Sequence, residues 1–79
     1  MAYAKTEQEW AERAARHLKA ELKRADVTYD ELARRLKKYG FEETKASIAN
    51  KLARATMSAH FLLASLAAVK VSQIRLDDI

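Results

Sequence analysis

Apolar residues recur every three or four positions through the first third of the chain, with polar residues between them. This spacing places them on one face of a helix. Thr6 and Glu9 have the Thr-x-x-Glu spacing of a capping box at a helix start. The pattern predicts a first helix over residues 6–25, with an apolar stripe that consists of Trp10, Ala14, Leu18, Leu22 and Ala25.

A second helix is predicted over residues 28–39 by signals at both of its ends. Thr28 and Glu31 repeat the capping-box spacing. Gly40, the only glycine in the chain, stands where a residue in the left-handed conformation commonly follows a helix. Residues 40–43 then form a connection, and Phe41 is expected to reach the core.

A third helix is predicted over residues 44–55, with Thr44 as its cap and with Ile48 and Leu52 turned inward. Its outer positions are polar or cationic and include no carboxylate, whereas a face that serves only solvation usually mixes both signs. These outer residues are therefore candidates for binding, and they are Lys45, Ser47, Asn50, Lys51 and Arg54.

The fourth predicted helix, over residues 58–70, is the most apolar segment, so we expect it at the centre of the bundle. In the tail, residues 71–79, Ile74 and Leu76 alternate with charged residues, which indicates a strand or an extended arm. The sequence thus predicts an all-α fold of four helices with an extended C-terminal tail, as one domain over residues 1–79.

The composition agrees with this fold and argues against several kinds of site. The 79 residues include no proline and one glycine, so little interrupts regular helix. There is no cysteine, hence no disulfide and no thiolate ligand. His17 and His60 lie on different predicted helices without metal-ligand spacing, and no glycine-rich phosphate loop is present. We therefore expect no enzyme activity, no metal site and no cofactor.

No segment predicts a membrane protein. The longest apolar stretch, residues 61–69, is interrupted by Ser65 and is too short to span a bilayer. Residues 1–5 lack the apolar core of a signal peptide. The first helix carries nearly balanced charges, which disfavours binding along a membrane surface. The expectation is a cytoplasmic protein without membrane contact and without an identifiable small-molecule substrate.

Positive charge is concentrated in the middle of the chain. The net charge is +4, and residues 27–56 hold seven Lys/Arg against four Asp/Glu, which gives +3 for that segment. Two interpretations are open: a solvated lysine-rich surface, or an interface for double-stranded DNA.

The DNA hypothesis places the third helix in the major groove. Asn50 can pair with adenine from such a helix, and the cations of the same face can reach guanine or phosphate. Side chains of the second helix would then contact the flanking phosphates. These predicted phosphate contacts are Thr28, Tyr29, Arg34, Arg35, Lys37 and Lys38.

Residues 15–72 resemble the helix-turn-helix of Cro/repressor-like (XRE-type) regulators. Residues 27–36 (VTYDELARRL) resemble the opening of the capped second helix with its Leu-Ala pair. Residues 44–48 (TKASI) look like the start of the recognition helix, and residues 61–69 (FLLASLAAV) resemble the helix that closes the core. The resemblance implies a Cro/repressor-like fold and sequence-specific DNA binding by a small prokaryotic-type transcriptional regulator.

A closer similarity is to a family of short bacterial domains of unknown function. That family shares a leading Trp and the pattern Asn-Lys-(Leu/Ile)-x-Arg-Gly-x-Phe-(Ser/Thr)-Ala, which corresponds here to residues 50–59 (NKLARATMSA). Ala55 replaces the glycine of the pattern, and Met57 replaces the aromatic residue. Without that glycine, the third helix is expected to run on or to end without a left-handed turn.

The chain also departs from ordinary repressors. Leu36 and Ile48 are twelve residues apart, several more than the tight turn of a repressor requires. A connection at residues 40–43 that stood out from the surface would block docking in the groove. The resemblance therefore implies the helix-turn-helix fold more firmly than it implies DNA binding. The main alternative is a non-enzymatic protein-interaction module that holds a partner with the fourth helix and the tail.

A symmetric homodimer through the fourth helix, the tail or both is also expected. A chain this short buries only about 60% of its unfolded surface, and dimerisation adds to that burial. Ile74, Leu76 and Ile79 of the tail need a surface to cover them. The alternative is a monomer in which the tail folds back over the first helix near Trp10.

Overall fold

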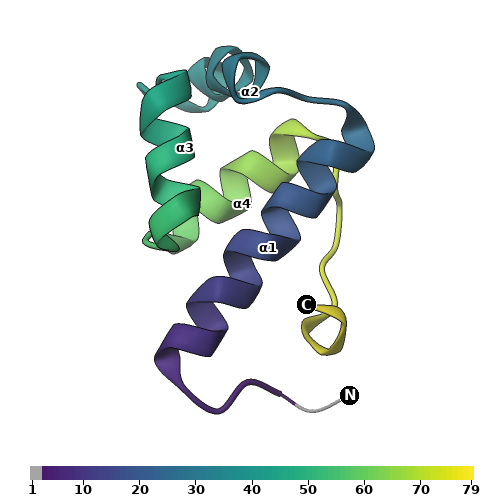
Figure 1. Ribbon diagram of the computed structural model, residues 1–79. Coiled ribbons are helices and arrows are strands. Elements are labelled where there is room, and N and C mark those ends of the chain that lie inside the picture. Colours follow the sequence, from purple (N-terminus) through teal and green to yellow (C-terminus); the bar gives the residue numbers. More distant parts are fainter. Residues whose placement is uncertain (1–2) are drawn as a thin grey trace.

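The computed structural model describes residues 3–79, so Met1 and Ala2 of the predicted domain lie outside the described part. Residues 3–79 form helices and no strand, which confirms the all-α prediction (Figure 1). The elements are α1 (Glu7–Ala25), α2 (Tyr29–Leu36), the 3₁₀ helix η1 (Lys37–Tyr39), α3 (Lys45–Arg54), α4 (Ala59–Ala68) and the 3₁₀ helix η2 (Leu76–Asp78).

Each α-helix begins at a hydroxyl residue whose side chain accepts a hydrogen bond from a backbone N–H three positions on. The four caps are Thr6, Thr28, Thr44 and Ser58, as the sequence predicts, with N–O distances of 3.0–3.2 Å in the pairs Thr6–Glu9, Thr28–Glu31, Thr44–Ser47 and Ser58–Phe61. Only Thr44 makes the reciprocal box, with Ser47. The box predicted at Thr28 is half made, because Glu31 bonds to Arg34 and Arg35 instead.

The four α-helical segments also end in the same way. The terminal residues Asp26, Gly40, Ala55 and Lys70 all have φ between 55° and 89°, in the left-handed region. The next backbone N–H, on Val27, Phe41, Thr56 and Val71, donates to a carbonyl five residues back. This is the Schellman arrangement, and it satisfies carbonyls that a helix end leaves free.

Two sequence predictions about helix ends are wrong. Ala55 does adopt the left-handed turn, with φ of 55°, since the hydrogen bonds from Ala55 and Thr56 to Leu52 and Lys51 hold it there. Gly40 does follow a helical segment, but α2 itself ends at Leu36 and tightens into η1. The last predicted helix is also shorter at both ends, at Ala59–Ala68.

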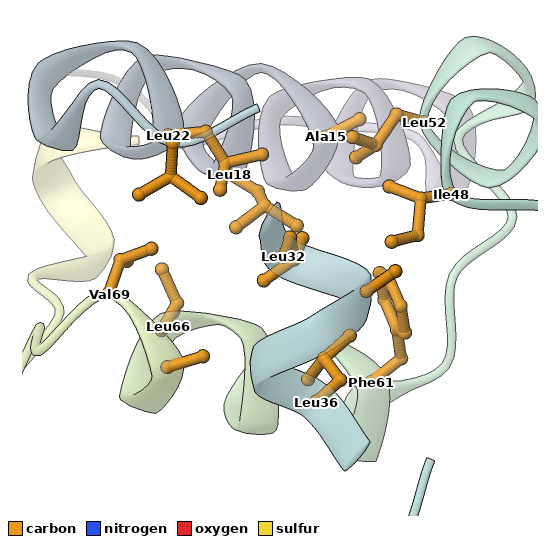
Figure 2. Packing of buried hydrophobic residues seen from close by; sticks show 13 residues of the cluster. Ala15, Leu18, Leu22, Leu32, Leu36, Ile48, Leu52, Phe61, Leu66 and Val69 are labelled. Carbon is orange, nitrogen blue, oxygen red and sulfur yellow. The ribbon is translucent and has the colours of Figure 1, made fainter. Parts of the chain in front are cut away.

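The core is formed by apolar side chains from all four α-helices, with leucines, Ile48 and Phe61 packed among smaller alanines and valines. Helix α2 lies in the middle of the cluster, with α1 across it and with α3 and α4 on different sides (Figure 2). The most deeply buried of these residues are Leu18, Leu32, Leu36, Ile48, Leu52 and Phe61.

Helix α4 is not at the centre, contrary to the prediction from its apolar composition. It packs against α1 and α2 through one face, and its other face is exposed. Leu63 is 63% exposed, and Ala59 and Ala67 one turn to either side are also exposed. On the inner face Ser65 is completely buried, and its hydroxyl has no hydrogen-bond partner within residues 3–79.

The tail lies beside α1 of its own chain (Figure 1). Residues 71–75 have no regular structure, and η2 follows where alternation predicted a strand or an extended arm. Ile74 packs against the core, and Gln73, Ile74 and Ile79 border a groove with Arg16, His17 and Ala20 of α1. Leu76 remains 58% exposed. Of the three tail residues expected to need cover, Ile74 and Ile79 are thus at least half covered within the chain.

Candidate nucleic-acid interface

The outward face of α3 is held in place by the burial of its opposite face. Ile48 and Leu52 are buried in the core, so the positions half a turn away point to solvent. Asn50 and Arg54 lie on this exposed face, together with the small residues Ala46 and Ala53.

Three of the five predicted α3 residues are exposed and free of internal partners. Lys45 is exposed in the first turn, and Asn50 and Arg54 follow along the helix. None of these three side chains makes a hydrogen bond or ion pair within the described residues. Because no internal contact has to be broken, all three can approach a ligand.

Lys51 and Ser47 are half-buried, in contrast to the outer position expected of both, and a contact of either with DNA stays a prediction. Lys51 Nζ bonds to Glu43 and lies 4.9 Å from the centroid of the Phe61 ring. Ser47 Oγ donates to the other oxygen of Glu43 at 2.6 Å. The lysine side chain is 35% exposed and that of Glu43 only 9%. The Glu43 carboxylate therefore bonds to two of the five predicted binding residues.

Glu43 is ionised at neutral pH. Burial acts to raise its pKa, but the hydrogen bonds from Lys51 and Ser47 outweigh burial and hold the pKa below its ordinary value. Glu43 is absent from the predicted site because it lies in the connection, before the helix begins. The available signal was its spacing, four residues before Ser47 and eight before Lys51, which corresponds to one and two helical turns.

The predicted phosphate contacts do not share one surface. Thr28 caps α2 with its hydroxyl oxygen, and Tyr29 is half-buried; both lie beside Lys19 and Lys23 of α1. Lys37 is exposed on η1. The other three predicted contacts, Arg34, Arg35 and Lys38, line a groove between α2 and α4 that contains no residue of α3.

Both arginines in that groove are held by Glu31. Arg34 Nη2 lies 2.6 Å from Glu31 Oε1, and Arg35 Nε lies 3.0 Å from Glu31 Oε2. These hydrogen bonds, from Arg34 first and Arg35 second, lower the pKa of Glu31. Arg35 also donates to the backbone oxygen of Ala68 at 3.0 Å.

Within residues 3–79 the structure brings together no group of three His, Cys, Asp or Glu side chains that could hold a metal ion. His17 lies 3.6 Å from Glu21 on α1, whereas His60 is exposed and stacks on Phe41 with ring centroids 6.1 Å apart. None of the described helices is both long enough and apolar enough to cross a membrane.

A family model described as a domain of unknown function, DUF6471, matches residues 10–74. The chain belongs to this family. The DUF6471 match runs from Trp10 to Ile74, so it includes all of α2, α3 and α4, the connection that contains Glu43, and the groove between α2 and α4. Comparison with curated proteins and with solved structures finds no match.

Proposed function

We propose that this protein binds double-stranded DNA as a small prokaryotic-type transcriptional regulator, with α3 in the major groove. The observation that carries the proposal is the exposed, carboxylate-free face of α3. Asn50 pairs with adenine, and Lys45 and Arg54 contact guanine or phosphate. Ala46 and Ala53 add little bulk, so the helix can lie close to the base edges.

The order of α2, connection and α3 supports a helix-turn-helix of Cro/repressor type. The connection is longer than in ordinary repressors, yet it packs against the body of the protein. Phe41 meets Phe61 edge to face with centroids 6.3 Å apart, and Glu43 is nearly buried beside Lys51. Glu42 is the exposed acidic residue of the connection. A packed connection favours access of α3 to the groove. The proposed setting is the cytoplasm, where the chromosome of such an organism lies.

The proposal includes a symmetric homodimer formed through α4. Ala59, Leu63 and Ala67 form an exposed stripe on a helix that carries no charged residue. Two copies related by a two-fold axis near Leu63 bury this stripe against itself. Such a pair can present two α3 helices to successive major grooves, about 34 Å apart.

A titration with random-sequence duplex at two salt concentrations tests DNA binding. The logarithm of affinity should fall linearly with the logarithm of salt concentration, by about 0.9 per phosphate neutralised. The double variant Asn50→Ala/Arg54→Ala should weaken binding at least tenfold, since it removes a base contact and a cation. Lys5→Gln, an exposed lysine ahead of α1, is the matched control. Salt-independent binding, or equal losses in variant and control, contradicts the proposal.

A protein-interaction module is the second candidate function, and the charge-free α4 stripe favours it. In that case α4 holds a partner protein, and the cations of α3 serve only solvation. Sedimentation of the chain with and without Leu63→Asp tests the stripe. A dimer that dissociates on this substitution with unchanged helix content supports self-association through α4. A 9.0 kDa species at all concentrations removes the dimer from the proposal.

A further inference from the structure

The groove between α2, η1 and the end of α4 is separate from the exposed face of α3. Its volume is about 610 Å³, within the size range of small-molecule sites. Four cationic side chains line it, with Glu31 as its one carboxylate; the cations are Arg34, Arg35, Lys38 and Lys70.

Most of the protein's net positive charge faces this groove. Four cations against one carboxylate give +3, in a chain whose net charge is +4. Glu31 is ionised and bonded to both arginines, so it offsets one of the four positive charges in the groove. Lys38 and Lys70 form no ion pair within residues 3–79. The excess charge is therefore unneutralised in the free protein.

The arginines are already oriented. The half-buried Arg35 side chain is fixed by two hydrogen bonds, one to Glu31 and one to the Ala68 carbonyl oxygen. The free carbonyl groups at the C-terminal end of a helix repel anions, and Arg35 neutralises part of this charge by donating a hydrogen bond to the Ala68 carbonyl oxygen of α4. Side chains held in advance lose less conformational entropy when they bind a ligand.

Lys70 is placed at the groove by the way α4 ends. Its backbone is left-handed, with φ of 65°, and its N–H donates to Ala67 as part of the Schellman turn. Glycine is the usual residue in this conformation. The turn directs the chain away from α4 just where the lysine borders the groove.

We propose that this groove binds a phosphoryl group carrying at least two negative charges. The guanidinium groups donate hydrogen bonds to phosphoryl oxygens, and the two lysines supply point charge. The phosphoryl group has two possible sources, a free phosphorylated compound or the backbone of a nucleic acid. The inference does not require that α3 binds DNA.

The test is an NMR titration with inorganic pyrophosphate at constant ionic strength. Saturable shifts are expected at the amides of residues 34–39 and 68–71. Lys38→Gln and Lys70→Gln should each weaken binding about fivefold or more, because each removes one charged contact. Lys19→Gln removes the same charge outside the groove and should leave the affinity unchanged. Shifts spread evenly over the cations of α1 and α3, or an equal loss in the control, overturn the proposal.

A second pair of variants separates charge from backbone strain. Lys70→Gly and Ala55→Gly both place glycine at a left-handed helix end, but only the first removes a groove cation. Lys70→Gly should weaken pyrophosphate binding, and Ala55→Gly should not. Equal affinities in the two variants contradict the role of Lys70.

Competition with duplex DNA identifies the source of the phosphoryl group. If pyrophosphate displaces duplex and Lys38→Gln weakens duplex binding, the groove holds backbone phosphates. If pyrophosphate binds while duplex binding is unaffected or absent, the groove holds a free phosphorylated compound. If duplex binding is absent while pyrophosphate binds, the result contradicts the proposed function of α3 and supports an independent anion site.

Discussion

Helices α3 and α4 have the same length of ten residues and similar ends, yet they present opposite surfaces to solvent. Each begins at a capping hydroxyl and is followed by a non-glycine residue in the left-handed conformation. The exposed face of α3 carries Asn50 and Arg54, whereas that of α4 carries Leu63 between two alanines. The inner faces of both helices pack against α1 and α2, so the requirements of the core do not account for this difference between the outer faces. The exposed faces of α3 and α4 are therefore the candidate binding surfaces.

Phe61 joins the two helices, and its truncation should have the largest effect. The Phe61 ring of α4 is buried and meets the Phe41 ring edge to face, and the Lys51 ammonium group of α3 lies over its face. Phe61→Ala should lower the free energy of unfolding by about 3–5 kcal/mol, through lost burial and a cavity. Denaturant unfolding measures this loss. Leu63→Ala, on the exposed side of α4, should change monomer stability by about 0.5 kcal/mol or less. Similar losses at both positions would contradict the assignment of the two faces.

Glu43 ties Lys51 to the base of α3, and its removal should have the next largest effect. Glu43→Gln should lower the free energy of unfolding at pH 7 by about 1–2 kcal/mol, since a charged hydrogen-bond network loses its charge. A carboxylate whose folded pKa is depressed contributes stability above its unfolded pKa, near 4.3, and loses it as pH falls further. The difference between parent and variant should therefore shrink as pH falls below the unfolded pKa, and vanish once Glu43 is protonated in both the folded and the unfolded state.

The same variant sharpens the comparison of surfaces. It releases Lys51 and removes a negative charge next to the exposed face of α3. If α3 binds DNA, duplex affinity should rise in Glu43→Gln although stability falls. A fall in duplex affinity together with stability would indicate that Lys51 acts only through its bond to Glu43.

Two serines of α4 should respond in opposite directions. Ser65 is buried, and its hydroxyl has no hydrogen-bond partner among residues 3–79, so Ser65→Ala should raise the free energy of unfolding by about 1 kcal/mol. Ser58 caps the helix through its bond to the Phe61 amide, so Ser58→Ala should lower it by about 1 kcal/mol. Thermal unfolding of both variants decides this, and a loss at Ser65 would mean that its hydroxyl is satisfied in solution.

The smallest effect is expected at the end of α3. Ala55→Gly should raise the free energy of unfolding by about 0.5–1 kcal/mol, because glycine adopts φ of 55° without the strain of a Cβ atom. Gly40→Ala should lower it by a similar amount for the same reason, since nothing within 4 Å would meet the added Cβ. Denaturant unfolding of the two variants should give changes of opposite sign.

The parts of the fold that the sequence predicts well depend on local chemistry. Thr6, Thr28 and Thr44 cap their helices because a cap acts within a few residues. Gly40 is left-handed at the end of η1, although α2 itself already ends at Leu36. Composition alone did not predict which side of α4 is exposed. An apolar helix has no polar face to mark the solvent side, so apolar composition indicated a central position that α4 does not occupy.

The candidate site was predicted less completely, because its contacts cross element boundaries. Asn50 and Arg54 were found from periodicity within one helix. The bond between Glu43 and Lys51 begins in a connection, and that between Arg35 and Ala68 spans 33 residues. Ala55 was misjudged because backbone hydrogen bonds hold a turn that residue preference alone disfavours.

The four left-handed helix ends affect how many destabilising substitutions this domain can tolerate during evolution. Three of them carry a residue other than glycine, at Asp26, Ala55 and Lys70, and each accepts a backbone conformation that glycine adopts more easily. A substitution to glycine at the exposed Asp26 can raise stability without removing a side chain that packs on the core, whereas Ala55 packs against it. The domain thus holds a reserve against destabilising changes elsewhere, available at sites where replacing the residue leaves the Asn50–Arg54 face intact.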